Sequence, residues 1–292
     1  MKNFTISLPP IIQGFLLLVI WLIMPLRVYG QDGFIEVKPR LAYWTVGQER
    51  QTVVVLHGGP GAPHQYLRPE FDALSQTAKV IYYDQRGCGK SERAPSYIWQ
   101  EHVADLKRLI TTLAKDQKVI LVGSSWGFVL ATLYAYTYPG DVKGVILTGT
   151  VPWQGEEKVY QRDAMLNKRP IKSLKASVGE IGIVTRQRSG GQAERDTVSI
   201  SKEYEVTSGL PENEPTMSWV SAPKAERLKQ IRIPILLFNG TRSQRFDGAS
   251  EYLKLFPSVQ VQTITEAGHD PWLRDPNLFF SISNEFIRST SK

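Results

Sequence analysis

Cysteine and long hydrophobic runs are both scarce in this sequence. Cys88 is the only cysteine in 292 residues, so no intrachain disulfide is available. The apolar run at residues 15–24 is about half of the roughly 20 residues that a transmembrane helix needs. Lysine and arginine form no run of five or more, and no basic stripe alternates with aromatic residues. These absences argue against a disulfide-stapled scaffold, a membrane anchor and a nucleic-acid-binding protein.

The N-terminal 30 residues have the pattern of a secretory signal. Lys2 precedes the apolar run, and Pro25 and a small-residue ending at Gly30 follow it. We therefore expect cleavage near Gly30 and a secreted or periplasmic protein without a stable membrane anchor. The alternative is that the segment is kept as an anchor. Its removal would lower the formal charge from +7 to +5, because Lys2 and Arg27 are lost.

The rest of the chain alternates strand and helix patterns. Residues 34–38 and 41–46 predict a hairpin, and apolar runs at 52–56, 79–83, 118–122, 142–147, 233–238 and 259–264 predict strands. Residues 97–114 predict an amphipathic helix with Asp105 outside its apolar face. This order is typical of an α/β fold with a mostly parallel sheet covered by helices. We expect a core at residues 31–150 and 230–292, interrupted by a largely helical cap at 151–229.

A strand, a tight turn and a helix follow one another at residues 118–134. The turn reads GSSWG at 123–127, which matches the G-x-S-x-G nucleophile elbow. In such an elbow the sharp turn exposes the central hydroxyl and leaves no room for side chains at the two glycines. Ser125 is therefore the candidate nucleophile.

A serine hydroxyl needs a neighbouring base and a third group that orients the base. Among the four histidines, His269 follows the last expected strand, while the other three precede the nucleophile. His269 is the candidate base. No cluster of histidine, cysteine and carboxylate residues has metal-ligand spacing, so we expect neither a metal nor a cofactor.

Four motifs together resemble the proline iminopeptidase branch of the α/β-hydrolase superfamily. They are HGGPG at 57–61, DQRGCGKS at 84–91, GSSWG at 123–127 and Gly-His at 268–269. The resemblance implies the α/β-hydrolase fold with an inserted helical cap, and the order Ser, acid, His along the chain. It also implies an oxyanion hole formed by the backbone N–H groups of Gly59 and Trp126. The 84–91 stretch is not a nucleotide-binding P-loop, because the residue five before Gly89 is Asp84 rather than glycine.

The sequence departs from this family at the acid of the triad. Family members carry Gly-x-x-Asp after the strand that ends here at Gly240, and this chain has Ser243 in the aspartate position. Asp247 is the nearest downstream carboxylate and the candidate acid, although an aspartate here is also a favoured helix N-cap. Glu156 and Glu157 are alternatives, because some hydrolases place the acid earlier in the chain. A third alternative is that the protein has no proper acid.

The expected activity is acyl transfer through Ser125 on a small molecule or short peptide, with N-terminal prolyl substrates first and small esters or amides second. Acidic residues would hold a substrate amine in this family, and Glu156, Glu157, Glu203 and Glu205 are available. None aligns with a family position, so the substrate-binding residues and the oligomeric state stay open. The competing hypothesis is a hydrolase-like binding protein that has lost turnover, which Ser243 favours.

Overall fold

The computed structural model describes residues 31–153, 172–187, 193–208, 210–242 and 248–291. All of them belong to one unit, Gln31–Lys292. Within these residues, no helix is both long and apolar enough to cross a bilayer. Residues 1–30 lie outside the described residues, so signal cleavage near Gly30 stays a prediction.

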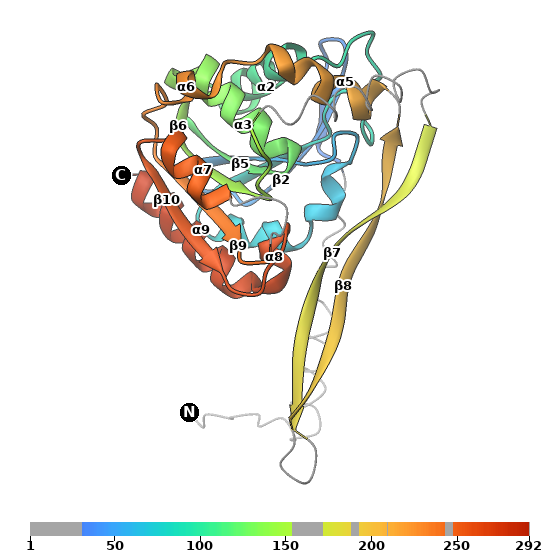
Figure 1. Cartoon of the computed structure of the whole chain (residues 1–292). Helices are drawn as coiled ribbons and strands as arrows, with labels where there is room; N and C mark the ends of the chain where they lie inside the picture. The colour runs from blue at the N-terminus through green and yellow to red at the C-terminus, as the bar shows by residue number, and fades with distance from the viewer. Residues whose placement is uncertain (1–30, 154–171, 188–192, 209, 243–247, 292) are drawn as a thin grey trace, which may run out of the picture. The chain divides into compact units, whose positions relative to one another are not determined.

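An eight-stranded sheet forms the centre of this unit (Figure 1). Its order is β1-β2-β4-β3-β5-β6-β9-β10, in which β1 and β2 are antiparallel and the six strands from β4 to β10 run parallel. The predicted hairpin and parallel sheet are confirmed. The strand bounds are Gly33–Ile35 (β1), Leu41–Val46 (β2), Thr52–Leu56 (β3), Lys79–Tyr83 (β4), Val119–Ser124 (β5), Val142–Thr148 (β6), Ile235–Gly240 (β9) and Val259–Ile264 (β10).

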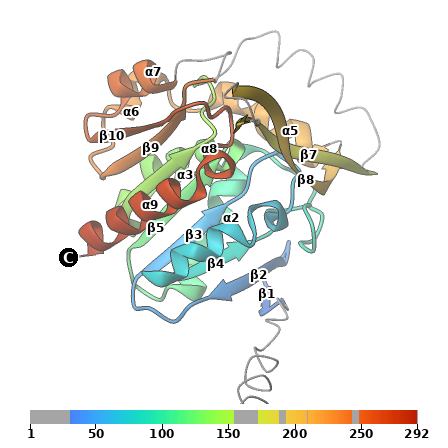
Figure 2. The same ribbon diagram turned by 90° about the horizontal axis from the view of Figure 1, so that it is seen from below.

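Helices cover both faces of the sheet, because alternate residues of each central strand point to opposite faces. In β3, Val54 and Leu56 pack with α2 and α3, while Val53 and Val55 pack on the face that holds α8 and α9. Figure 2 shows α9 running across the second face. The helices are Trp99–Leu113 (α2), Trp126–Thr137 (α3), Leu210–Ser218 (α5), Ala225–Leu228 (α6), Gly248–Leu255 (α7), Pro271–Arg274 (α8) and Pro276–Ser291 (α9), with short 3₁₀ turns at His64–Leu67 (η1), Glu70–Gln76 (η2), Pro139–Asp141 (η3) and Trp219–Ser221 (η4).

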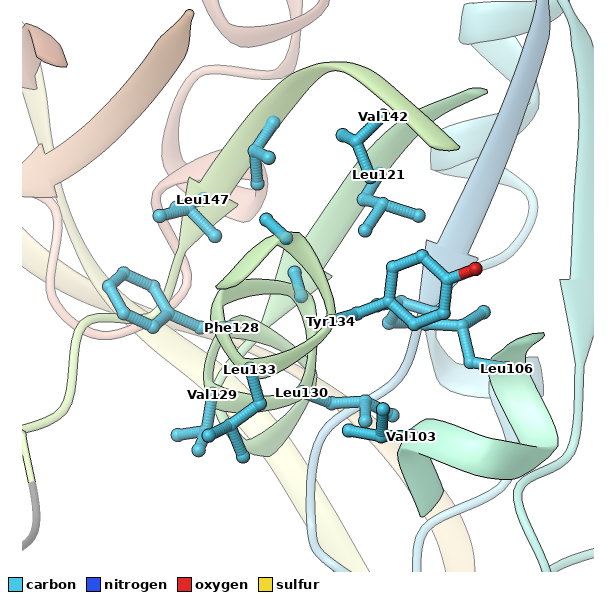
Figure 3. Packing of buried hydrophobic residues seen from close by; sticks show 14 of the residues in the cluster. Val103, Leu106, Leu121, Phe128, Val129, Leu130, Leu133, Tyr134, Val142 and Leu147 are labelled. Carbon is cyan, nitrogen blue, oxygen red and sulfur yellow. The ribbon is translucent and has the colours of Figure 1, made fainter. Parts of the chain in front are cut away.

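Helix α3, which follows the elbow, is the most deeply buried helix of the core. Its residues from Trp126 to Ala135 are all buried, so it is apolar around its whole circumference rather than along one stripe. Figure 3 shows Phe128, Val129, Leu130 and Leu133 of this helix pointing outward in different directions among residues of β5, β6 and α2. This packing holds the N-terminus of α3, and with it the elbow, against the sheet.

The expectation for Asp105 on α2 is wrong. The carboxylate of Asp105 is buried, and it binds Arg86 through two hydrogen bonds of 2.7 Å. A helical pattern treats every carboxylate as an outward-facing residue, whereas a bidentate guanidinium partner allows this one to be buried. The pair joins α2 to the 84–91 loop.

The inserted segment is only partly helical. Lys172–Gln187 (β7) and Ala193–Ser208 (β8) form a separate antiparallel pair, and helical structure follows only from α5 onward. The prediction of a largely helical cap is therefore wrong for these two strands. Stretches such as TVSIS at 197–201 alternate polar and β-branched residues with the period of a strand, a signal that the prediction missed. The N–H of Thr207 donates to the carbonyl of Gly61, at 2.9 Å, so the end of β8 meets the glycine loop.

Candidate active site

Ser125 occupies a strained turn between β5 and α3. Its backbone has φ 56° and ψ −117°, a conformation that non-glycine residues rarely adopt. Such a conformation costs about 1–3 kcal/mol and persists only where the surroundings impose it. The N–H of Ser125 donates to the carbonyl of Thr148, at 3.1 Å, which ties the turn to β6. The residue as a whole is half-buried rather than buried, unlike its neighbours Ser124 and Trp126.

The two elbow glycines have the role that the sequence predicts. A Cβ on Gly123 would lie 2.3 Å from the carbonyl oxygen of Gly127, and one on Gly127 would lie 2.0 Å from that of Leu56. Each contact is with backbone, which cannot swing away. Any side chain at these positions would therefore displace α3 from the sheet.

His269 lies in the loop between β10 and α8, directly beside the elbow. Gly149 separates the two groups: a Cβ at Gly149 would lie 3.0 Å from the Ser125 backbone nitrogen and 3.2 Å from His269 Nε2. Gly240 lets the His269 loop approach β9, because a Cβ there would lie 2.3 Å from the Ala267 carbonyl oxygen. The fold thus brings together the candidate nucleophile and the candidate base, which are far apart in sequence.

Sequence patterns did not identify Gly149 as a residue of the site. A glycine directly after β6, the strand that pairs with the elbow strand β5, is a signal that could have identified it. Gly149 has φ +63°, so alanine there would be strained as well as crowded. We expect Gly149→Ala to lower kcat by about tenfold or more, because a shift near 1 Å at a reacting group can cost about a hundredfold.

Steady-state kinetics with a melting curve would test this expectation. Gly140→Ala is the matched control, since a Cβ at Gly140 meets nothing within 4 Å. Equal activity in the two variants would show that Gly149 does not separate reacting groups.

Burial lowers the pKa of His269 from its usual value of 6.5. Protein around the ring disfavours the charged form, even though part of the residue stays exposed. Among the described residues burial is the influence that moves this pKa, and no carboxylate acts against it. His269 is accordingly neutral at pH 7, the state in which an imidazole can accept a proton.

The candidates for the triad acid lie outside the described residues. Ser243 and Asp247 fall in the segment 243–247, and Glu156 and Glu157 fall in 154–171. The assignment of Asp247 therefore stays a prediction. Glu203 and Glu205 are in β8, but their side chains are likewise outside the description.

The two candidate oxyanion donors lie on either side of Ser125. Gly59 belongs to the loop after β3, and its neighbour Gly58 abuts the elbow, since a Cβ there would lie 2.9 Å from Ser125 Cβ. Trp126 is the first residue of α3, so its N–H has no acceptor within the helix. The oxyanion role of Gly59 and Trp126 stays a prediction.

Gln85 joins these two segments, and the sequence reasoning missed it. Its side-chain amide donates to the carbonyl of His57, at 2.8 Å, and accepts from the indole N–H of Trp126, at 2.9 Å. Its backbone N–H donates to Nε2 of His57, at 2.9 Å. The remainder of the 84–91 loop is anchored by Asp84, whose carboxylate accepts from His64 Nδ1 at 2.8 Å and from the N–H of Lys90 at 2.8 Å. The motif thus forms a scaffold behind the elbow.

His57 is a structural residue of this scaffold. Since Nε2 accepts a hydrogen bond from Gln85, the proton lies on Nδ1, which faces the carbonyl of Gly58 at 3.1 Å. Complete burial lowers the pKa of His57 to about 4, so the ring is neutral in the folded protein.

This lowered pKa predicts a loss of stability in acid. An unfolded histidine binds a proton below about pH 6.5, whereas His57 does so only near pH 4. Its stabilising contribution is thus complete above pH 6.5 and is lost as the pH falls toward 4. We expect His57→Gln to remove about 2–3 kcal/mol of the fall in unfolding free energy between pH 7.5 and 4.5. Urea denaturation at both pH values measures this, and identical pH dependence in the two proteins would contradict it.

An aromatic cluster surrounds the indole of Trp126. His102 packs edge-on against it at 5.7 Å between ring centroids, and Trp219 does so at 6.4 Å. Trp153 packs in turn against Trp219, at 5.5 Å. Trp219 belongs to η4, so the last part of the inserted segment packs against the elbow. His102 is buried, and neither ring nitrogen has a hydrogen-bond partner among the described residues.

No group of three or more histidine, cysteine or carboxylate side chains that could hold a metal ion occurs in the described part of the chain. Cys88 is buried in this region, and burial raises the pKa of its thiol well above the usual range. This thiol is therefore a poor nucleophile.

Comparisons with known proteins agree with this geometry. The alpha/beta hydrolase fold family matches residues 51–172. A proline iminopeptidase of Heyndrickxia coagulans is 27% identical over 81% of this chain and 90% of its own length. A proline iminopeptidase of Thermoplasma volcanium is 32% identical, but that match covers 52% of this chain and only 54% of the relative.

Solved structures show the same fold. An alpha/beta hydrolase fold protein from Chitinophaga pinensis has a TM-score of 0.65 at 18% identity, covering 88% of this chain and 97% of its own. A proline iminopeptidase from Mycobacterium smegmatis has a TM-score of 0.62 at 16% identity, covering 89% and 98% of the two chains. The sheet order and these matches show that the chain has the α/β-hydrolase fold, with a match to the alpha/beta hydrolase fold family over residues 51–172, and that its sequence resembles the proline iminopeptidases.

Proposed function

We propose that the protein is a serine hydrolase that acts by acyl transfer through Ser125. The observation that carries this proposal is the position of the Ser125 elbow and His269 on either side of Gly149. Ser125 Oγ attacks the substrate carbonyl while neutral His269 accepts its proton. The carbonyl oxygen becomes an oxyanion, and the N–H groups of Gly59 and Trp126 stabilise it. His269 then returns the proton to the leaving group, and water releases the acyl group by the same steps.

The preferred substrates are peptides or arylamides with an N-terminal proline. Support comes from the similarity to proline iminopeptidases, which extends over most of the chain in the Heyndrickxia coagulans protein. The HGGPG and DQRGCGKS stretches, which carry the resemblance, are joined to each other through His57 and Gln85, and Gln85 also accepts a hydrogen bond from Trp126 of the elbow. Small esters are the second class, because the same acyl transfer applies to them.

One assay series tests the activity and its substrate class. Purified protein is given proline p-nitroanilide, alanine p-nitroanilide and p-nitrophenyl acetate, with a fluorophosphonate probe in parallel. We expect labelling of Ser125 and a kcat/KM for the prolyl substrate at least tenfold above that for the alanyl one. Ester turnover without prolyl turnover would identify a carboxylesterase. Absence of both labelling and turnover would favour the hydrolase-like binding protein that Ser243 suggests.

We also propose that the protein is exported and cleaved near Gly30. The support is the charge, length and small-residue ending of residues 1–30. N-terminal sequencing of protein from the periplasm or medium should begin near Gln31. Membrane-bound protein that keeps residues 1–30 would show an anchor instead.

A further inference from the structure

We infer that Gln85 is a positioning residue that sets the spacing between the two oxyanion donors, Gly59 and Trp126. This inference rests on the proposed function, because it assumes the acyl transfer at Ser125. Gln85 does not itself contact the reacting atoms. It binds both segments that carry the donors.

The first segment is the glycine loop. Gln85 Nε2 donates to the main-chain carbonyl of His57, two residues before Gly59. The N–H of Gln85 holds the imidazole of the same residue, so His57 is bound at its backbone and at its ring. On the far side of the loop, the N–H of Gly58 donates to the hydroxyl of Tyr66, at 2.7 Å. The backbone leading to Gly59 is therefore fixed from two directions.

The second segment is the start of α3. Gln85 Oε1 accepts from the indole N–H of Trp126, and that indole makes T-shaped contacts with His102 and Trp219. Rotation of the ring is thus blocked by packing, and its position along the sheet edge is set by the hydrogen bond. Because the side chain and the backbone N–H of Trp126 belong to one residue, fixing the indole restrains the direction of the second donor.

The chemistry explains why the residue is a glutamine. An indole N–H can only donate and a main-chain carbonyl can only accept, so the bridging group needs one acceptor and one donor. These partners also determine the orientation of the amide, with oxygen toward Trp126 and nitrogen toward His57. A primary amide provides both functions without charge, and Gln85 is buried, so an unmatched partner would remain without water.

The expected effect is on the transition state, because the oxyanion forms only there. Loss of one oxyanion donor costs about a hundred- to a thousandfold in kcat in enzymes of this mechanism. Misplacing a donor without removing it should cost less. We therefore expect Gln85→Met, which keeps the length and removes both hydrogen bonds, to lower kcat by about 10- to 100-fold with KM changed less than threefold.

The matched control is Ser91→Ala. Ser91 is buried in the same loop, where its hydroxyl donates to the carbonyl of Asp84 and accepts from the N–H of Ala42, so it binds β2 rather than the oxyanion segments. A merely structural role for the loop predicts similar kinetic losses in both variants. The positioning role predicts a large loss of kcat in Gln85→Met alone at comparable melting temperatures.

A second variant gives a measurement, the pH dependence of kcat, that a purely structural role of Gln85 would not change. Gln85→Glu keeps an acceptor for Trp126, but an ionised carboxylate cannot donate to the His57 carbonyl. Burial raises the pKa of such a carboxyl group, and its protonated form regains the donor. The ratio of kcat in this variant to kcat in the wild type should thus rise severalfold as the pH falls from 8 to 6.

The experiment measures kcat and KM on p-nitrophenyl acetate and proline p-nitroanilide for the wild type and the three variants. A selective fall in kcat for Gln85→Met, together with the pH-dependent recovery of Gln85→Glu, supports the inference. Equal kcat values in Gln85→Met and Ser91→Ala overturn it and leave the proposed function standing. If Gln85→Met does not fold, a pH-independent ratio for Gln85→Glu overturns it. A wild type that neither turns over substrate nor reacts with the fluorophosphonate overturns both.

Discussion

Replacing Ser125 with alanine is expected to abolish hydrolysis, to below a few per cent of wild-type turnover, while the protein stays folded. Ser125 is half-buried at the tip of an elbow held by main-chain contacts, so loss of one hydroxyl group should disturb little of the packing. Removal of the nucleophile should therefore abolish turnover without lowering the stability of the fold. Turnover with the preferred substrate and far-UV circular dichroism measure the two effects. A folded Ser125→Ala protein that keeps substantial turnover would refute the assignment.

Glycine at the same position separates the catalytic role from the strain. Ser125→Gly also lacks the hydroxyl and should be equally inactive. Because glycine tolerates the positive φ of 56°, this variant should melt a few degrees above Ser125→Ala, as expected for about 1 kcal/mol of relieved strain. A lower melting temperature for glycine would mean that the elbow conformation is not strained.

The second large effect is expected at the triad acid. If Asp247 orients His269, Asp247→Asn should lower kcat by orders of magnitude, because a neutral amide can favour the wrong imidazole tautomer and cannot stabilise the imidazolium. If Asp247 is only a helix cap, turnover and stability should barely change, since asparagine caps as well as aspartate. Kinetics and thermal denaturation of this one variant distinguish the two roles.

The reciprocal change, Ser243→Asp, restores the residue that the family carries at this position. It should raise kcat if the natural triad is incomplete, and it should oppose the burial effect that now lowers the pKa of His269. Its pH–rate profile would then shift to a higher apparent pKa. A silent Asp247→Asn together with a strongly activating Ser243→Asp would show that the protein works naturally with Ser125 and His269 alone.

Local patterns were sufficient wherever a residue's role depends on its neighbours in the chain. The strand and helix around Ser125, the two elbow glycines and most strands of the sheet follow from runs of apolar residues and from the close approach of backbone segments. His269 could be assigned because a known chain order places the base after the last strand. These features need no knowledge of which distant residues meet.

Local patterns gave wrong predictions where a residue's environment depends on a partner that is distant in the sequence. Asp105 is an outward-facing carboxylate by helical periodicity, and Arg86, 19 residues away, allows it to be buried. The strands β7 and β8 pair with each other, whereas a largely helical cap was predicted there. For Asp105 a tertiary contact outweighs the local preference, whereas for β8 the alternation at 197–201 was a local strand signal that the prediction missed.

The sequence by itself determined the fold class and pointed to the candidate nucleophile and the candidate base, because short motifs with a local physical cause carry these features. Only the tertiary structure decided that Gly149 separates Ser125 from His269 and that Gln85 links His57 to Trp126. Residues 57, 85 and 126 lie on three different segments, which meet because parallel strands bring their carboxyl ends to one edge of the sheet. The distance between two such segments in the folded protein cannot be predicted from the sequence of either segment alone.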